Sequence, residues 1–174
     1  MILDAGHGGS DPGAVSISMP AIFEKDITLA SVHSMRLNLI KSGIIVYLTR
    51  ALEASMSLEH RVRQANGYGS DLFISIHANA AENHTAQGFE VHYYSSDGLA
   101  VSRHIIDAVK KAGYNIHGGG IFQSDFYVLR KTKMIAILIE LGFITNDQDL
   151  ALLMSSESRG KLIDVVSEAI LTWV

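Results

Sequence analysis

The sequence alternates between short apolar runs and longer stretches in which apolar residues recur every three or four positions. Short apolar runs bounded by turn residues are typical of buried strands, and the longer period is typical of helices that pack against a sheet. The predicted strands are Ile2–Asp4, Ile44–Thr49, Leu72–His77, Gly88–Tyr93, Tyr127–Leu129 and Ile135–Glu140. The predicted helices are Glu24–Lys41, Leu58–Gly67, Leu99–Ala112, Gln148–Met154 and Ser156–Trp173.

This order of elements predicts an α/β fold, with a twisted, mostly parallel sheet of about six strands flanked by helices on both faces. We expect residues 1–174 to form a single domain, because a chain of this length with 48% hydrophobic content can bury a full core. No repeat, low-complexity tract or linker interrupts the chain. The Gly-rich segment His117–Gly120 is too short to separate domains, and we expect it to be a mobile loop. Functional groups are expected near the carboxyl ends of the strands.

The charge pattern and the cysteine count exclude several kinds of partner and site. The formal net charge is -4 and there is no run of Lys or Arg, so the electrostatic footprint of a nucleic-acid-binding protein is missing. The chain has 0 Cys, which leaves His and carboxylates as the candidate metal ligands. No apolar run approaches the roughly 18 to 20 residues that a membrane span needs. The sequence as given also carries no export signal.

Two histidines and one glutamate lie at predicted ends of strands and helices. His7 follows the first strand in a Gly-His-Gly-Gly turn, His77 closes the third strand, and Glu24 opens the first long helix. Each has an ordinary explanation when taken alone: a turn residue, a hydrogen-bonded core histidine, and a helix start favoured by the helix dipole. Together, two His and one Glu match the protein ligands of a catalytic zinc site that leaves its fourth position to water. The chain has no His-Glu-x-x-His helix, so such a site would be assembled from distant segments.

A further candidate is Glu140, which closes the apolar run Ile135–Ile139. Burial without a partner is costly and raises the pKa of a carboxyl group, which suits a general base beside a metal-bound water. The ordinary alternative is a carboxylate that accepts backbone N–H bonds at the start of the next loop. The remaining histidines show no mutual metal spacing. Among them only His117, in the Gly-rich segment, is kept as a candidate for contact with a substrate.

Seven short motifs are spread over nearly the whole chain. They are Asp4-Ala5-Gly6-His7-Gly8-Gly9-Ser10-Asp11-Pro12-Gly13-Ala14, Glu24-Lys25-Asp26, Leu48-Thr49-Arg50, Ser75-Ile76-His77-Ala78-Asn79, Gly88-Phe89-Glu90-Val91, Tyr127-Val128-Leu129-Arg130 and Glu140-Leu141-Gly142-Phe143. In this order the motifs resemble those of the zinc-dependent N-acetylmuramoyl-L-alanine amidase family of cell-separation enzymes, spore-cortex hydrolases and phage endolysins. The chain departs from the family at Ala5, where Pro is usual, and lacks the basic residue often found before Tyr127.

The resemblance implies that His7, Glu24 and His77 bind one zinc ion per chain and that Glu140 is the catalytic glutamate. It also implies a peptidoglycan hydrolase, acting on the cell wall outside the cytoplasmic membrane. The bond that it would cleave is the amide between the lactyl group of N-acetylmuramic acid and the L-alanine of the stem peptide. Weaker candidates are Asn79 and Arg130, for orienting ligands or contacting substrate.

Two other functions stay open at this point. A zinc carboxypeptidase or endopeptidase would use the same metal chemistry within the stem peptide, and a non-catalytic peptidoglycan-binding domain would need neither Glu140 nor an open zinc position. We also expect the domain to need no activator. The predicted elements between His77 and Glu140 leave no room for a helical plug, and the loops Ala80–Gln87 and Gly113–Phe126 lack the apolar stripe that such a helix would need.

Overall fold

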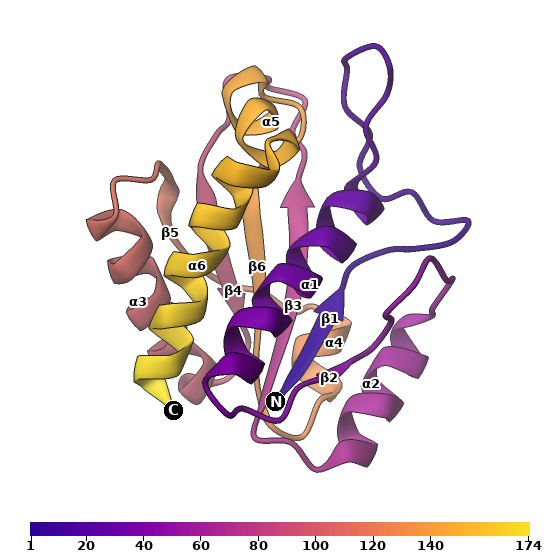
Figure 1. Ribbon diagram of the computed structural model, residues 1–174, viewed down its shortest axis with the longest axis vertical. Coiled ribbons are helices and arrows are strands. Elements are labelled where there is room, and N and C mark those ends of the chain that lie inside the picture. Colours follow the sequence, from indigo (N-terminus) through magenta and orange to yellow (C-terminus); the bar gives the residue numbers. More distant parts are fainter.

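The computed structural model describes residues 1–174 and contains a central sheet of six strands (Figure 1). The strands are β1 (Ile2–Ala5), β2 (Tyr47–Leu48), β3 (Leu72–Asn79), β4 (Phe89–Tyr93), β5 (Ile116–Gln123) and β6 (Ile135–Phe143). Their order across the sheet is β2-β1-β3-β6-β4-β5. Every neighbouring pair is parallel except β4 and β6, which are antiparallel. The predicted α/β fold with a mostly parallel sheet is confirmed.

Helices cover both faces of the sheet, as predicted. They are α1 (Glu24–Lys41), α2 (Leu58–Tyr68), α3 (Ser96–Lys111), α4 (Tyr127–Lys131), α5 (Asp147–Met154) and α6 (Ser156–Trp173). Neighbouring residues of a strand point to opposite faces. Ile74 of β3 therefore joins the larger core with Leu39 of α1 and Ile163 of α6, and Phe73 joins a smaller core with Val62 of α2. In Figure 1, α1, α3 and α6 lie in front of the sheet, and α2 and α4 belong to the other layer.

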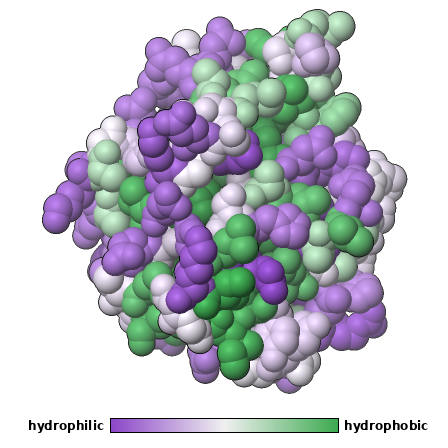
Figure 2. Space-filling view, viewed as in Figure 1, coloured by the Kyte–Doolittle hydropathy of each residue, from purple (hydrophilic) through white to green (hydrophobic).

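Apolar residues also reach the surface at one end of the molecule. On the face that Figure 2 shows, they gather low in the view, where α1 and α6 end in Figure 1. Leu37, Ile40 and Trp173 are the exposed large apolar residues of these two helices. None of the helices has the length and apolar character that crossing a membrane requires.

The centre of the sheet places the candidate residues next to one another. β3 lies between β1 and β6, and its residue His77 pairs in register with Glu140 of β6. Both strands continue past their predicted ends, β3 to Asn79 and β6 to Phe143. The side chains of His77 and Glu140 therefore stand side by side on one face of the sheet, near its carboxyl edge.

The strand predicted at Tyr127–Leu129 is wrong, because these residues lie in the short helix α4. Three apolar residues are too few to reveal a helical period. Val128 and Leu129 are buried in the smaller core together with side chains of α2. Packing against a neighbouring helix therefore decides the local structure here, against the preference of Tyr127 and Val128 for strands.

The loop predicted over Gly113–Phe126 is also wrong in part, because its middle forms β5, which pairs in parallel with β4. The ladder between the two strands has a register shift after Phe89, which accommodates extra residues. The glycines of the segment Gly118–Gly120 have φ values of 53°, 91° and 81°, in the region that other residues rarely adopt. A strand interrupted by such glycines has no alternating apolar pattern, so β5 could not be predicted from the sequence.

Candidate metal centre

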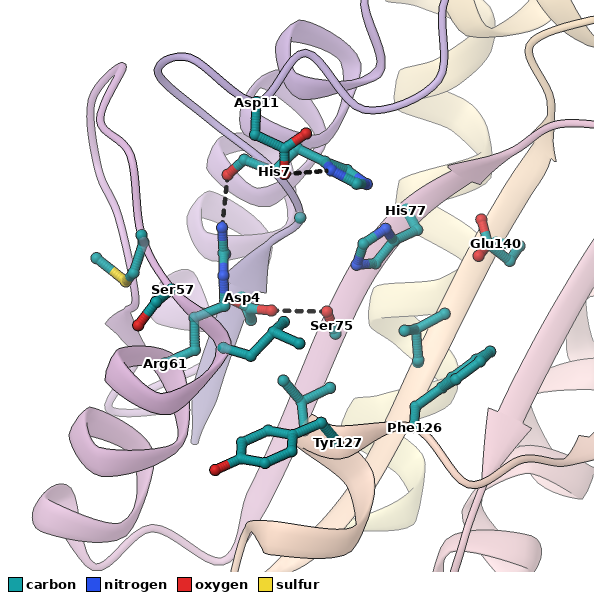
Figure 3. A pocket seen from close by; sticks show the side chains of 15 residues that line it. Asp4, His7, Asp11, Ser57, Arg61, Ser75, His77, Phe126, Tyr127 and Glu140 are labelled. Atoms are coloured by element: carbon teal, nitrogen blue, oxygen red, sulfur yellow. Dashed lines mark hydrogen bonds and ion pairs between the residues drawn. The ribbon is translucent and has the colours of Figure 1, made fainter.

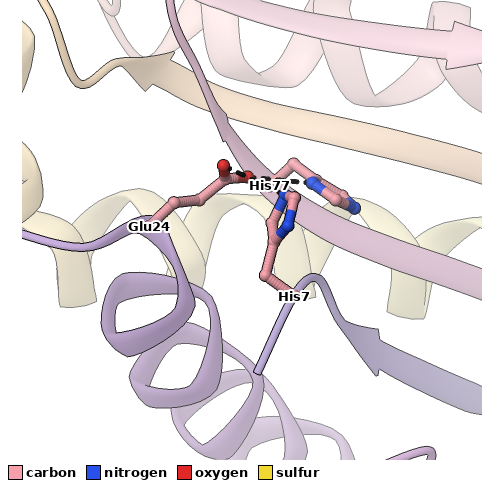
Figure 4. Close-up of side chains that lie close together, drawn as sticks. All are labelled: His7, Glu24 and His77. Atoms are coloured by element: carbon pink, nitrogen blue, oxygen red, sulfur yellow. Dashed lines mark hydrogen bonds and ion pairs between the residues drawn. The ribbon is translucent and has the colours of Figure 1, made fainter. Parts of the chain in front are cut away.

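Three side chains from separate elements converge beyond the carboxyl end of β1 (Figure 4). His7 follows β1, Glu24 is the first residue of α1, and His77 lies in β3. Glu24 Oε2 lies 3.1 Å from His7 Nε2, and Glu24 Oε1 lies 2.9 Å from His77 Nδ1. One ligand atom from each residue lies within 4.8 Å of the other two. The fold thus brings together the three residues that sequence reasoning grouped as zinc ligands.

Two glycines leave the space that these side chains occupy. A Cβ atom at Gly6 would overlap the ring of His77. A Cβ atom at Gly13 would lie 2.5 Å from Glu24 Oε2 and 2.7 Å from His7 Cδ2. His7 itself has a φ of 59°, a left-handed conformation that is uncommon outside glycine. The local backbone is therefore shaped around the two imidazoles and the carboxylate.

Two buried arginines hold the backbone of the His7 turn. Arg61 Nη2 donates a hydrogen bond of 2.6 Å to the carbonyl oxygen of His7, and Arg50 Nη2 donates one of 3.0 Å to that of Gly6. Arg61 also forms a buried ion pair of 2.7 Å with Asp4 of β1. Charge-assisted bonds of this kind are stronger than bonds between neutral groups. The two arginines therefore hold the backbone of the His7 turn in its unusual conformation.

Asp11 fixes the ring of His7 and is a functional candidate that the sequence reasoning missed. Its Oδ2 lies 2.9 Å from His7 Nδ1, the ring nitrogen that faces away from Glu24. Metal-binding histidines commonly donate their second N–H group to a carboxylate, which sets the tautomer and the ring orientation. Asp11 also accepts a bond of 3.0 Å from the backbone N–H of Gly13. The sequence did offer a signal for Asp11. It is followed by Pro12 and Gly13, which favour a turn, and this turn brings its carboxylate close to His7.

The surroundings of Glu24 favour its ionised form. Backbone N–H groups of Ala14 and Ala78 donate to its two oxygens at 2.8 Å and 3.0 Å. Burial by itself would raise the pKa of Glu24, but hydrogen bonds from His7 and His77 outweigh it and hold the pKa well below its ordinary value. The pKa of His7 is raised, because its interactions with Glu24 outweigh the lowering effect of burial. One carboxylate and two imidazole nitrogens, without a thiolate, form a donor set that suits Zn²⁺.

Glu140 stands beside His77 and is held very differently from Glu24 (Figure 3). Its Oε2 atom is buried and has no hydrogen-bond partner. Burial raises the pKa of Glu140 well above its ordinary value, and repulsion from the charges of Glu24 and Glu90 adds to the increase. A carboxyl group whose pKa is raised holds a proton more readily than an ordinary carboxylate, which suits a group that takes up and returns a proton. This is the environment predicted for Glu140 from the sequence.

A cavity of about 440 Å³ opens beside His7, His77 and Glu140 (Figure 3). Its apolar lining comes in part from the start of α4 and from β6, and it includes Phe126 and Leu138. Cavities that combine an apolar wall with a few converging polar groups are typical of ligand-binding sites. The reactive groups of the candidate site therefore border a space that a ligand can enter.

The two weaker candidates lie apart from the three converging side chains. Asn79 donates a bond of 2.9 Å to Oε2 of the buried Glu90, and it does not line the cavity. Arg130 is paired with Asp125 on the surface of α4 and does not line the cavity either. A role in orienting the metal ligands or in contacting substrate stays a prediction for both residues.

Glu90 organises a second polar cluster, which the sequence reasoning did not find. It is 4% exposed and pairs in register with Glu140 across the antiparallel strands β4 and β6. It accepts from Asn79, while the Nε2 atoms of His92 and His117 lie 3.2 Å and 3.6 Å from its oxygens. His117, predicted in a mobile loop, thus belongs to β5 and is tied to this cluster. The link to Glu140 depends on the strand order, which the sequence does not reveal.

These features describe an α/β domain with a candidate His-Glu-His metal site at the edge of its sheet. Comparison with known proteins gives the family. The family model for N-acetylmuramoyl-L-alanine amidases of the Amidase_3 type matches residues 1–172. The chain belongs to this family, so the resemblance seen in its motifs is confirmed.

Individual relatives agree with this assignment. The chain is 36% identical over 149 residues to the probable cell wall amidase LytH of Staphylococcus aureus, an alignment that covers 86% of this chain and 49% of LytH. The chain thus spans about half the length of the curated relatives it matches. Among solved structures, the amidase AmiC2 of Nostoc punctiforme has a TM-score of 0.92 at 31% identity, covering 99% of this chain and 94% of that one. The catalytic domain of the amidase CwlV from Bacillus (Paenibacillus) polymyxa has a TM-score of 0.92 at 30% identity, with 99% and 96% covered.

Proposed function

We propose that this domain is a zinc-dependent N-acetylmuramoyl-L-alanine amidase that cleaves the amide between the lactyl group of N-acetylmuramic acid and L-alanine. The observation that carries the proposal is the convergence of His7, Glu24 and His77 beside the unpaired carboxyl group of Glu140. Membership of the amidase family over residues 1–172 supports it. The domain would act on peptidoglycan outside the cytoplasmic membrane, the place that the name of its relative, a probable cell wall amidase, suggests.

In this proposal His7 Nε2, His77 Nδ1 and a carboxylate oxygen of Glu24 hold one zinc ion per chain. Three protein ligands leave one coordination position open, as catalytic zinc sites do and structural ones do not. When bound there, zinc supplies Lewis acidity that polarises the scissile carbonyl and makes water more acidic. The side chains of His7 and His77 are 26% and 19% exposed, so water and substrate can reach the residues that would hold the ion.

Glu140 carries the proton transfers of the proposed reaction. Its carboxylate takes a proton from the attacking water, whose oxygen adds to the carbonyl carbon of the lactyl group. The bond between that carbon and the nitrogen of L-alanine then breaks, and Glu140 returns the proton to the leaving nitrogen. The products are a free lactyl carboxyl group and a free amine on L-alanine. Glu140 lines the cavity and no protein group donates to its Oε2, which supports this role because the carboxyl group is not engaged by the protein.

The test uses a soluble muramoyl peptide and compares the zinc-loaded protein with chelated protein and three variants. We expect one zinc ion per wild-type chain, and we expect His7→Ala and His77→Ala to lose both zinc and activity. Glu140→Gln should keep zinc and fold but lose about 10²-fold or more in turnover, because the amide keeps the shape and removes the base. Released L-alanine amines are measured together with the metal content.

Two results would contradict the assigned roles of the residues, and two more would point to another function. Full zinc occupancy in both histidine variants would disprove the ligand assignment. Near wild-type turnover of zinc-loaded Glu140→Gln would disprove the role as general base. If amines appear from other residues of the peptide instead of L-alanine, the domain is a peptidase of the stem peptide; zinc binding without any cleavage would indicate a binding module.

A further inference from the structure

The cavity beside the candidate metal site is placed to receive the peptide part of the proposed substrate. A glycan strand continues in both directions from each muramic acid residue, so it has to lie across a surface. The stem peptide leaves the strand as a single branch and can enter a cavity. Two residues of a peptide span about 7 Å. With the scissile amide at His7, His77 and Glu140, the second residue of the peptide therefore lies within the cavity of about 440 Å³.

The cavity offers no free positive side chain to this second residue. Arg61 is the only Lys or Arg that lines it, and its Nη1 atom is paired with Asp4 at 2.7 Å, with both side chains buried. Its remaining bonds go to the backbone carbonyl oxygens of Ala5 and His7. Arg61 is therefore committed to the protein, and its charge is compensated by Asp4.

The other lining groups disfavour an anion as well. Asp11 and Glu140 are acidic, and the rest of the lining includes the apolar side chains of Phe126 and Leu138. A carboxylate transferred to an apolar surface without a counter-ion loses much of its hydration energy, whereas an amide loses far less. The hydroxyl group of Ser57, which also lines the cavity, can bond an amide.

We propose that this domain selects stem peptides whose second residue carries a carboxamide in place of a free α-carboxylate, that is, D-isoglutamine over D-glutamate. The buried pair of Arg61 and Asp4 determines this selectivity, because it engages the only Lys or Arg side chain of the cavity that could receive a carboxylate. The proposal rests on the proposed amidase function and names the substrate class of the same site.

The first test compares two soluble substrates, N-acetylmuramoyl-L-alanyl-D-isoglutamine and N-acetylmuramoyl-L-alanyl-D-glutamate. We expect kcat/KM for the amide to be about tenfold higher, which corresponds to about 1.4 kcal/mol. Binding of both compounds to the zinc-loaded Glu140→Gln protein is measured in parallel by calorimetry, and the amide should again bind more tightly. Equal values for the two compounds, or a preference for the carboxylate, in either measurement would overturn the proposal. Cleavage of neither compound, with the amide still bound more tightly, would contradict the amidase function alone.

A charge introduced at the cavity supplies the second test. Leu58 lines the cavity at the start of α2, and Leu37 on α1 does not, although both side chains are 51% exposed. Leu58→Lys should raise the ratio of kcat/KM for the D-glutamate compound to kcat/KM for the amide compound by about three- to tenfold, because the new cation offsets the carboxylate. Leu37→Lys should leave the ratio unaltered. An unchanged ratio in Leu58→Lys, or the same change in both variants, would show that the charge of the cavity does not set the preference.

Discussion

Glu140, whose Oε2 atom is buried, differs from the buried carboxylates of this chain in its hydrogen bonding. Asp4, Glu24, Glu90 and Asp149 each accept at least two hydrogen bonds, whereas no donor reaches Oε2 of Glu140. An unpaired buried carboxyl group weakens the folded state once it ionises. Such a group is expected at a position where the residue serves a chemical function and not stability, because residues with shifted pKa values cluster at functional sites.

The raised pKa of Glu140 predicts how stability depends on pH in the metal-free protein. Burial, followed by repulsion from Glu24 and Glu90, raises the pKa above its ordinary value of 4.5. Between 4.5 and the folded-state pKa, the folded chain keeps a proton that the unfolded chain has lost, so this group makes stability fall as pH rises through that window. Glu140→Gln removes this effect. Its gain in the free energy of unfolding over the wild type should therefore grow from pH 4 to pH 8, by about 1 kcal/mol or more.

Chemical denaturation of both proteins in the presence of a chelator measures this difference. The interactions of Glu24, whose pKa is lowered, are present in both proteins and cancel to first order in the comparison. A difference between variant and wild type that stays constant from pH 4 to pH 8 would mean that Glu140 is not destabilised by burial.

Asp11 should matter for zinc affinity, because it holds His7 Nδ1 at 2.9 Å. We expect Asp11→Ala to weaken zinc binding by about 10- to 100-fold, the usual effect of losing a partner of a metal-binding histidine. Asp26→Ala provides the control, since Asp26 is an exposed carboxylate in the first turn of α1. Competition with a zinc chelator measures both affinities. Equal zinc affinities of the two variants would show that Asp11 does not support His7 as a zinc ligand.

At the scale of the elements, long periodic segments were predictable and short ones were not. The helices α1 and α6 begin and end at their predicted residues, because 18 residues show several turns of the period. The three-residue strand predicted at Tyr127–Leu129 had no such support, and packing of Val128 against α2 turns the segment into a helix. The strand β5 was not predicted, because its glycines give no alternating apolar pattern. These glycines lie where the pairing of β5 with β4 shifts register.

The glycines of β5 offer a matched test of this arrangement. Gly119 and Gly120 both have positive φ values, 91° and 81°. A Cβ atom at Gly119 would meet nothing within 4 Å, while one at Gly120 would lie 2.5 Å from Ile116 Cγ2 and 2.7 Å from Ile106 Cδ1. Gly119→Ala should cost about 1 to 2 kcal/mol from backbone strain alone. Gly120→Ala should cost about 1 to 3 kcal/mol more from overpacking, and equal losses in thermal or chemical denaturation would contradict this course of β5.

At the scale of the whole molecule, the candidate metal site was easier to predict than its surroundings. His7, Glu24 and His77 could be grouped because each lies at a recognisable end of a strand or helix, and such ends meet at one edge of a parallel sheet. The cluster around Glu90 depends on the antiparallel pairing of β4 with β6. Nothing in the spacing of residues reveals that pairing, so the neighbour of Glu140 across the sheet could not be found from the sequence.

The arrangement of the domain also bears on whether it needs an activator. The segment between His77 and Glu140 forms β4, α3, β5 and α4, and the cavity beside His7 is lined by none of the residues 78–125. Residues 78–125 therefore do not border the cavity, and the rest of the segment contributes Phe126, the start of α4 and Leu138 to its lining. We accordingly expect the isolated domain to act on cell walls without a partner protein.

Digestion of purified peptidoglycan by the isolated domain tests the central claim most directly. Zinc-loaded and chelated protein are incubated with the polymer, and new amino-terminal residues and new reducing sugar ends are determined in the products. The account predicts that zinc-loaded protein, with nothing else added, frees the amine of L-alanine and leaves the glycan strands intact, and that chelation stops the reaction until zinc is restored. Amines from other residues, new reducing ends, or equal release by the chelated protein would contradict it.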